Sequence, residues 1–459
     1  MTDDDDELPR RSKRPLFAVL ALVIAGGVAW KLLHPPPKPE LPERTLFRKL
    51  LVTWVIAQAR HDLSAPDALA ACVAAAQPWP EVAKAIEALP AAWDDRDALE
   101  VATKNLNRAA RASGLAFWVD PQFPDGKPIL TTYEVLRRST WVSEPSRVEV
   151  IQVRRLDTLN LVLGLLGHAS GDQPAVLRDR IEMSVLDKLR VDTDDRPNAV
   201  DDAAAQLWRE HLTPLVGAAG LAEADRRVNE RERLARAMEK RLKGGKIHVP
   251  RPERLVFGDS YFENLEPYTS NTRRGGPLIL ASDLRALRRA DEALDDSEGL
   301  RALLQIIELE SELVEAHEAR HDLDPREVKT PDLLQHLVGE DDLRFGKMAE
   351  RELRAFIGQL HDGRPPACLS VVSLAQLARG RHSQSTPHFF AAHALLSTLG
   401  GVDGTRGLDE GQVIEVMKAL CALPDDELRQ GAAAASETLY GEPLKPAHQL
   451  VEKLDSLKP

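Results

Sequence analysis

Aromatic side chains are scarce in this chain of 459 residues, and basic charge is not in excess, because 60 Lys and Arg stand against 72 Asp and Glu. Aromatic residues make up 5% of it, and the net charge is −12. A nucleic-acid binder would show a basic face, so the acidic balance argues against that class of partner. Hydrophobic residues account for 43%, which is enough for the cores of two to three domains. No internal repeat is evident.

Cysteine is nearly absent as well. Cys72, Cys368 and Cys421 are scattered and form no C-x-x-C pair. Neither a thiolate zinc site nor a dense disulfide framework is therefore indicated. One disulfide can form in an oxidising compartment, and one thiol would then remain unpaired.

A long apolar run stands near the N-terminus, at residues 16–33, with Lys31 as its single charge. It is long enough to cross a bilayer, and the basic cluster at residues 10–14 favours a cytoplasmic N-terminus. The alternative is a signal peptide cleaved after residues 27–29. Because Trp30 follows and the apolar run continues, the pattern favours an anchor.

These features predict a single-pass protein of the inner membrane whose bulk is periplasmic or extracellular. The expected divisions are a cytoplasmic tail at 1–14, a transmembrane helix at 15–33, a stiff Pro-rich spacer at 34–44, a helical and α+β region at 45–250, and a C-terminal domain at 251–459.

The soluble region has a mainly helical pattern, and we expect the α+β class with a small antiparallel sheet. Apolar residues recur at helical spacing from Pro42 to about Ser113. Three runs rich in β-branched and aromatic residues follow, bounded by turn residues, at 115–123, 129–142 and 146–156. Helices are predicted over 158–189 and 201–243, a short strand over 277–281, and helices from there to the C-terminus.

The strongest chemical signal is the sequence His317-Glu318-Ala319-Arg320-His321, an H-E-x-x-H motif in a predicted helix from about Leu300 to Leu323. Residues at i and i+4 share one helix face, so both imidazoles can reach one metal ion. Glu318 would then lie beside the metal, where it can act as base on a bound water. The alternative without a metal is a charged, solvated helix face on which the two histidines occur by chance.

A catalytic zinc needs a third protein ligand and keeps one position for water. The candidates are Glu350 and Glu352 on the next predicted helix, Asp324 on the motif helix, and Glu327 beyond Pro325. Asp324 has two further interpretations, as an acceptor that orients an imidazole or as part of the helix end.

On these residues the chain resembles the zincin metallopeptidases, and within them the gluzincins, over about residues 300–360. The resemblance implies Zn²⁺ bound by His317, His321 and one of Glu350 or Glu352, with Glu352 favoured and Glu318 as base. It also implies a zincin-like helical domain at 251–459. The charged Arg320 departs from the uncharged residues usual inside the motif.

Residues outside the motif are candidates for stabilising an oxyanion. They are His388, which follows the motif as do His382 and His393, and Tyr261 or Tyr268, which precede it. The strand expected near Leu278 offers an edge for an extended substrate.

The resulting hypothesis is a membrane-anchored zinc metallopeptidase that acts on a peptide or protein. Its rivals are a non-catalytic envelope scaffold and a purely structural zinc site.

Overall fold

The computed structural model describes residues 42–157, 167–170, 173–189, 199–249, 255–270, 278–295, 297–324, 329–339, 343–379 and 386–450. The tail predicted at 1–14 and the transmembrane helix predicted at 15–33 lie outside these ranges. Helix α2 begins at Pro42, so residues 42–44 are helical and do not belong to the predicted spacer at 34–44. None of the helices within the described ranges is both long and apolar enough to span a membrane.

The described residues form a mainly helical protein with one small mixed sheet. The helices are α2 (Pro42–Ala59), α3 (Ala65–Ala75), α4 (Pro80–Ala92), α5 (Arg96–Ala112), α6 (Arg178–Leu189), α7 (Ala199–Val216), α8 (Ala218–Gly244), α9 (Asp259–Leu265), α10 (Ala281–Asp295), α11 (Glu298–Leu323), α12 (Asp332–Val338), α13 (Leu343–Asp362), α14 (Ala367–Ala378), α15 (Pro387–Gly400), α16 (Glu410–Cys421) and α17 (Asp425–Tyr440), with short 3₁₀ turns η1 (Pro124–Gly126) and η2 (Glu266–Thr269). The strands are β1 (Phe117–Gln122), β2 (Ile129–Ser143), β3 (Ser146–Arg155), β4 (Gly167–Ser170), β5 (Gln173–Leu177) and β6 (His448–Leu450).

The three predicted antiparallel strands are confirmed as β1, β2 and β3. Two more strands extend the sheet in the order β1-β2-β3-β5-β4, with β5 parallel to β3 and β4 antiparallel to β5. The helix predicted over 158–189 is therefore wrong where β4 and β5 lie, and the helix begins only at Arg178. A short apolar run such as β5 has no periodicity that separates a buried strand from a buried helix.

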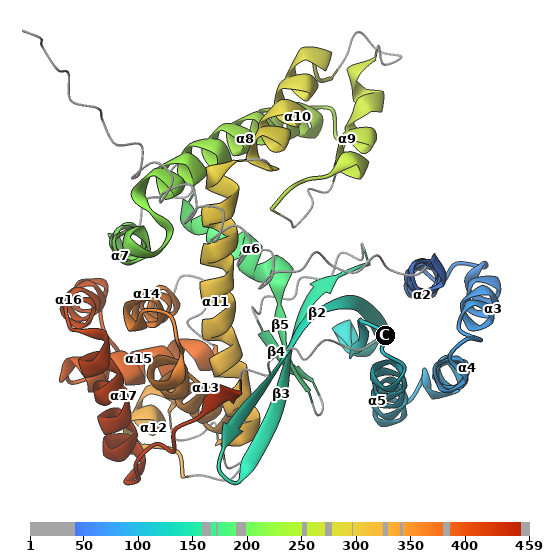
Figure 1. Cartoon of the computed structure of the whole chain (residues 1–459). Coiled ribbons are helices and arrows are strands. Elements are labelled where there is room, and N and C mark those ends of the chain that lie inside the picture. The colour runs from blue at the N-terminus through green and yellow to red at the C-terminus, as the bar shows by residue number, and fades with distance from the viewer. Residues whose placement is uncertain are drawn as a thin grey trace, which may run out of the picture.

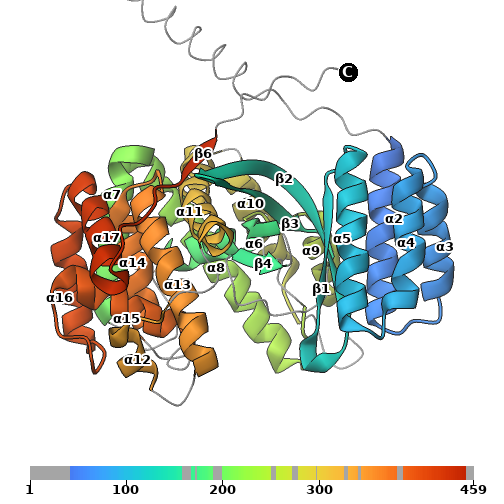
Figure 2. The same ribbon diagram turned by 90° about the horizontal axis from the view of Figure 1, so that it is seen from below.

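Helix α11 runs through the middle of the molecule, with the sheet on one side and the C-terminal helices α12–α17 on the other (Figure 1). Helices α2–α5 stand side by side beyond β1, at the opposite end from those C-terminal helices (Figure 2). The largest hydrophobic core joins α6–α8, α11 and the C-terminal helices, whereas α2–α5 and β1 have a core of their own.

Helices α8, α9 and α10 form an arm that projects from the top of α11 in Figure 1. A small apolar cluster holds the arm together, and it includes Met238 and Leu242 of α8 with Phe257, Phe262 and Leu287 from after residue 250. The division predicted at residue 250 thus falls inside one packed cluster. The strand predicted over 277–281 is wrong, because residues 278–280 form a bend and α10 begins at Ala281.

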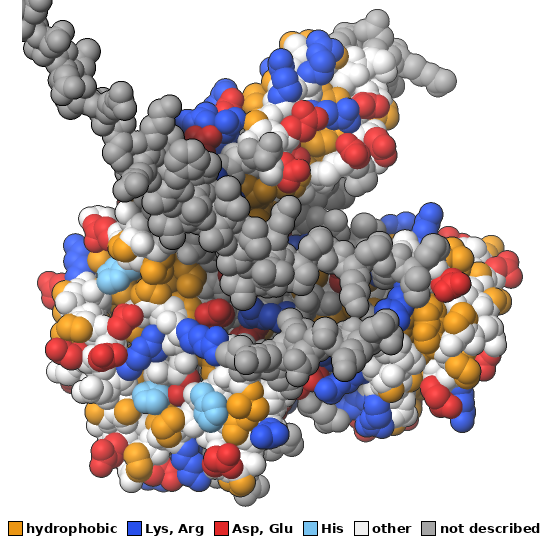
Figure 3. Space-filling view, viewed as in Figure 1, with side chains coloured by type: hydrophobic (Ala, Val, Ile, Leu, Met, Phe, Trp, Pro, Cys, Tyr) orange, Lys and Arg blue, Asp and Glu red, His pale blue; other side chains and the backbone are white. Residues whose placement is uncertain are grey.

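The cysteines also take defined places. Cys368 and Cys421 form a disulfide between α14 and α16, and Cys72 is a free, buried thiol. On the face seen in Figure 3, acidic and basic side chains are interleaved over the described parts of the surface.

Candidate metal centre

The predicted motif helix is α11, which begins after Ser297 and ends at Leu323. The Ser297 hydroxyl accepts a hydrogen bond from the Leu300 amide at 3.0 Å, as an N-cap residue should. The residues from Leu313 to Arg320 are all buried, because the sheet covers one side of α11 and α13 covers another. A helix buried on several faces holds its side chains in fixed directions.

Three side chains of the predicted metal set meet between α11 and α13. Nε2 of His317 lies 3.2 Å from Nε2 of His321 and 3.1 Å from Oε2 of Glu352. Nε2 of His321 lies 3.6 Å from the same Glu352 oxygen. One ligand atom from each of the three residues therefore lies within 4.8 Å of the other two.

These separations fit a metal ion. Tetrahedral zinc with bonds of about 2.0–2.1 Å would hold its ligand atoms roughly 3.3–3.4 Å apart. The three measured separations are 3.1, 3.2 and 3.6 Å. Two imidazoles and one carboxylate are also a donor set that zinc uses. The buried Nδ1 atom of His321 has no hydrogen-bond partner among the described residues, whereas the Gln359 side chain lies near enough to His317 to act on its pKa, as an orienting partner would.

The electrostatics of the three residues are strongly coupled. Burial lowers the pKa of His317. Burial also opposes charge on His321, yet the hydrogen bond to Glu352 and the charges of Glu352 and Glu318 outweigh it and raise its pKa. Burial of Glu352 is likewise outweighed by hydrogen bonds and charges from both imidazoles, which hold its pKa well below its usual value. A metal cation in this space would compete with protons for the imidazole nitrogens and the Glu352 carboxylate.

Glu318, the predicted base, is 6% exposed and faces strand β4. Its carboxyl group packs so closely against Gly167, the first residue of β4, that a Cβ at that position would overlap it. Its charge reaches His321, whose pKa it helps to raise. Glu318 thus lies next to the ligand set, on the side of α11 that faces the sheet.

His388 approaches the same centre from a third helix, α15. Its Nε2 lies 3.2 Å from Oε2 of Glu352, and burial lowers its pKa. Phe356, one turn after Glu352 on α13, contacts the rings of both His317 and His388. His388 was predicted as an oxyanion stabiliser, and the structure brings it to the ligand set.

The two alternate third ligands lie elsewhere. Glu350 is directed toward Arg354, and its burial raises its pKa to about 7. Asp324 is the C-cap residue of α11, and its carboxylate lies 3.1 Å from Nη1 of Arg320 and 3.7 Å from Nε of Arg354. Burial raises the pKa of Asp324 although these cations oppose the shift. Neither carboxylate belongs to the group formed with His317 and His321.

The charged residue inside the motif, Arg320, is 1% exposed, and its hydrogen-bond partners are not members of the group formed by His317, His321 and Glu352. Its Nε donates to Oδ2 of Asp362 at 2.8 Å, and its Nη2 donates to the Lys445 carbonyl at 2.8 Å. Its stem also lies against Gly358 of α13, where a Cβ would overlap it. Arg320 therefore fastens α11 to α13 and to the C-terminal segment.

The remaining candidates are not at the centre. Tyr261 and Tyr268 belong to the cluster of the arm. The Nδ1 atom of His393 accepts the Leu408 amide at 2.9 Å, which is a structural role. Glu327 and His382 lie outside the described residues.

Gly167 is the residue of this neighbourhood that sequence reasoning missed. It follows an apolar stretch, where a glycine often marks a close approach between backbone and another group. That signal was present in the sequence, but its partner, Glu318, is 151 residues away and could not be found from spacing.

Comparison of the chain with protein-family models, with curated proteins and with solved structures finds no match. The likeness to zincins therefore remains one of motif and of the residues around it.

Replacing Gly167 with alanine should force Glu318 or β4 to move, because no space exists for a methyl group there. We expect the free energy of unfolding to fall by about 1–3 kcal/mol, the usual effect of overpacking. Gly244→Ala is the matched control, since nothing lies near its missing Cβ, and it should stay within about 0.5 kcal/mol of wild type. Denaturant unfolding of both variants is the measurement, and equal stability would contradict the contact.

Replacing Arg320 with methionine should leave the buried Asp362 without its cation. We expect a loss of about 3–5 kcal/mol in the free energy of unfolding, as for other broken buried pairs. Arg96→Met, which breaks an exposed pair with Glu100, should cost no more than about 1 kcal/mol. Adding Asp362→Asn to Arg320→Met should restore part of the loss. If the Arg320 variant is as stable as the Arg96 variant, the fastening role is wrong.

Proposed function

We propose that this protein is a zinc-dependent metallopeptidase that hydrolyses peptide bonds and is anchored in a membrane by residues 15–33. The observation that carries the proposal is the meeting of His317, His321 and Glu352 at separations that suit one tetrahedral ion. These residues come from two helices, and His317 and Glu352 are 35 positions apart in the sequence. Metal binding explains why two imidazoles and a carboxylate meet there.

The chemistry follows from the residues around the ligand set. A zinc ion held there would polarise a water molecule and lower its pKa towards about 7. Glu318, beside His321 and shielded by β4, would accept the proton of the attacking water and deliver it to the leaving amine. His388 is placed to donate a hydrogen bond near Glu352, where negative charge on the substrate oxygen would develop.

The neighbouring strand supports a peptide as substrate. In the described sheet β4 is the terminal strand, paired with β5 on one side, and its first residue lies against Glu318. An extended peptide can add to such an edge through main-chain hydrogen bonds. The edge offered for a substrate is thus β4 and not the segment near Leu278.

The membrane anchor rests on the sequence. The apolar run at 16–33 follows the basic cluster at 10–14, and that order favours an N-terminus in the cytoplasm with the bulk of the chain across the inner membrane. A disulfide between Cys368 and Cys421 suits an oxidising compartment on that side.

Glu318→Gln should abolish peptide hydrolysis while zinc stays bound, because this carboxylate is the proton carrier and not a ligand. We expect turnover to fall by about 10²–10⁴, the usual contribution of a general base. His321→Ala should lose the zinc itself. The matched control is Glu312→Gln, a change of the same kind on the same helix outside the ligand set. Zinc content by elemental analysis and cleavage of a denatured protein by the full-length chain are the measurements.

The outcomes separate the alternatives. A non-catalytic envelope scaffold would bind no zinc and tolerate all three changes. Zinc that is bound without hydrolysis, in wild type and in Glu318→Gln alike, would point to a structural metal site. Equal hydrolysis by wild type and Glu318→Gln would contradict the role of Glu318.

A structural zinc site is the second candidate, because His388 is close enough to Glu352 to become a fourth protein ligand. A fourth protein ligand would close the position that water needs. If His388 instead serves the reaction, His388→Ala should keep its zinc and lower kcat by about 10²–10³ with little change in KM. Loss of zinc from this variant would favour the structural site.

The control for that experiment is His336→Ala. His336 is an exposed histidine of α12 whose Nδ1 lies 2.7 Å from the Asp332 carbonyl of its own helix. We expect this variant to match wild type in zinc content and in turnover.

A further inference from the structure

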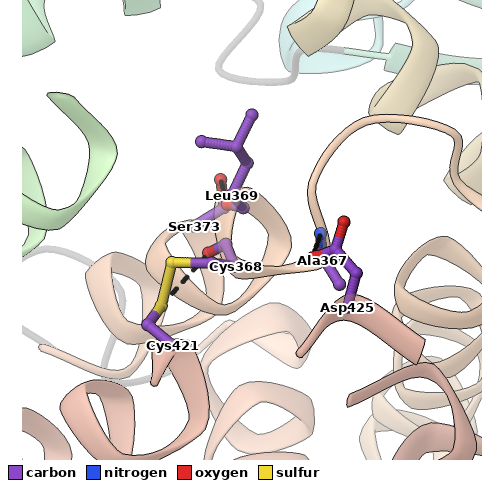
Figure 4. Close-up of a disulfide and its surroundings, with 6 residues drawn as sticks. All are labelled: Ala367, Cys368, Leu369, Ser373, Cys421 and Asp425. Atoms are coloured by element: carbon purple, nitrogen blue, oxygen red, sulfur yellow. Dashed lines mark hydrogen bonds between the residues drawn. A yellow bond between two sulfur atoms is a disulfide. The ribbon is translucent and has the colours of Figure 1, made fainter. Parts of the chain in front are cut away.

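The disulfide region contains a third metal-binding residue that the bridge does not use. Cys368 lies in the first turn of α14, and Cys421 is the last residue of α16. Figure 4 shows the disulfide that joins them. His211 of α7 completes a group whose ligand atoms all lie within 4.8 Å of one another. Both α14 and α16 pack on α7, so the three residues are held together by the helices that carry them.

Within the part of the chain that the structure describes, no structural role in packing or hydrogen bonding is evident for the imidazole of His211. It is half-buried and forms no hydrogen bond or ion pair with the described residues. Both cysteines are at most 5% exposed and belong to the main hydrophobic core. An imidazole directed at two sulfurs inside an apolar shell is an arrangement that the disulfide alone does not explain.

We propose that Cys368, Cys421 and His211 form a second zinc site, which is blocked while the disulfide is intact and opens when the disulfide is reduced. Two thiolates and one imidazole are a ligand set that zinc binds tightly. The site shares no residue with the centre at His317 and His321. The proposal of a second zinc site therefore does not depend on the proposed peptidase activity.

The chemical steps need one co-reactant, a dithiol that exchanges with the disulfide. A dithiol of the thioredoxin class supplies two electrons and two protons, which break the sulfur–sulfur bond and give two thiols, while the dithiol becomes a disulfide. Zn²⁺ then binds both sulfurs as thiolates, and two protons are released. In the reverse direction, a disulfide of the same class accepts the two electrons and two protons to become a dithiol, the Cys368–Cys421 bond forms again, and the ion is released.

The geometry allows the exchange. The sulfurs must separate from bonding distance to roughly 3.8 Å, the spacing expected for two sulfurs at about 2.3 Å from a tetrahedral zinc. The two Cα atoms are 4.8 Å apart, and rotation of the side chains about their Cα–Cβ bonds can achieve this separation without moving either helix.

If the proposal holds, α14 and α16 are cross-linked both in the oxidised and in the reduced protein. The disulfide joins the helices in an oxidising compartment, and zinc would join them after reduction. Because both helices pack on the same core as α11, this exchange would preserve the C-terminal part of the fold when the disulfide is lost.

Cobalt binding to the full-length chain tests the proposal. Co²⁺ bound by thiolates gives a ligand-to-metal charge-transfer band in the near ultraviolet, whereas the sulfur-free set at His317, His321 and Glu352 cannot. We expect no such band before reduction, a band after reduction with a dithiol, and its loss when Zn²⁺ displaces Co²⁺. Elemental analysis should find one more zinc per chain in the reduced protein than in the oxidised protein.

Matched variants identify the ligands. His211→Ala should weaken metal binding to the reduced protein by roughly tenfold or more, and His336→Ala should not. Cys72→Ala should keep the band, because Cys72 lies in the separate core of α2–α5. Cys421→Ser should abolish it.

Two results would overturn the proposal. One is a reduced protein that stays folded by circular dichroism and gives no thiolate band. The other is a band of equal affinity in wild type and His211→Ala. If reduction unfolds the C-terminal helices, refolding on addition of Zn²⁺ supports the site, and failure of Zn²⁺ to restore the fold overturns it.

Discussion

The buried carboxylate of Glu315 is the contact on which the geometry of α11 depends. It is fully buried, and it accepts four hydrogen bonds, from Arg137 at 2.6 Å and from Ser139, Gln152 and Gln449 at 2.9 Å. A buried charge is tolerated only when it is paired and hydrogen-bonded, and this one binds α11 to β2, β3 and β6 at once. Because Glu315 lies two residues before the motif, it fixes how the helix is rotated against the sheet.

A second buried ionic contact fixes the other side of the same helix. Arg320 binds Asp362 at the end of α13, so α11 is held by charge toward the sheet and toward α13 alike. Between these contacts the helical repeat directs His317 and His321 to Glu352 and directs Glu318 to β4. The charged residue that departs from the usual zincin motif therefore stabilises the packing that aligns His317 and His321 with Glu352.

The two ligand groups differ in how the fold supplies them. His317 and His321 are preorganised by one helix, and α13 adds Glu352 from a buried interface. Cys368, Cys421 and His211 come from three helices, and only their packing brings them together. The geometry of the first group does not depend on redox conditions, whereas that of the second depends on whether the two sulfurs are bonded to each other.

The sequence by itself determined what depends on local periodicity: the motif helix with its i, i+4 histidines, the three strands β1–β3, and most helices after residue 281. It could not separate β5 from a buried helix, because a short apolar run fits both. The choice of Glu352 over Glu350, the approach of His388 and the contact of Gly167 with Glu318 were decided by tertiary structure. So was the pairing of Cys368 with Cys421. Each of these joins residues from different elements, and the direction of one helix face relative to another depends on packing that no local pattern records.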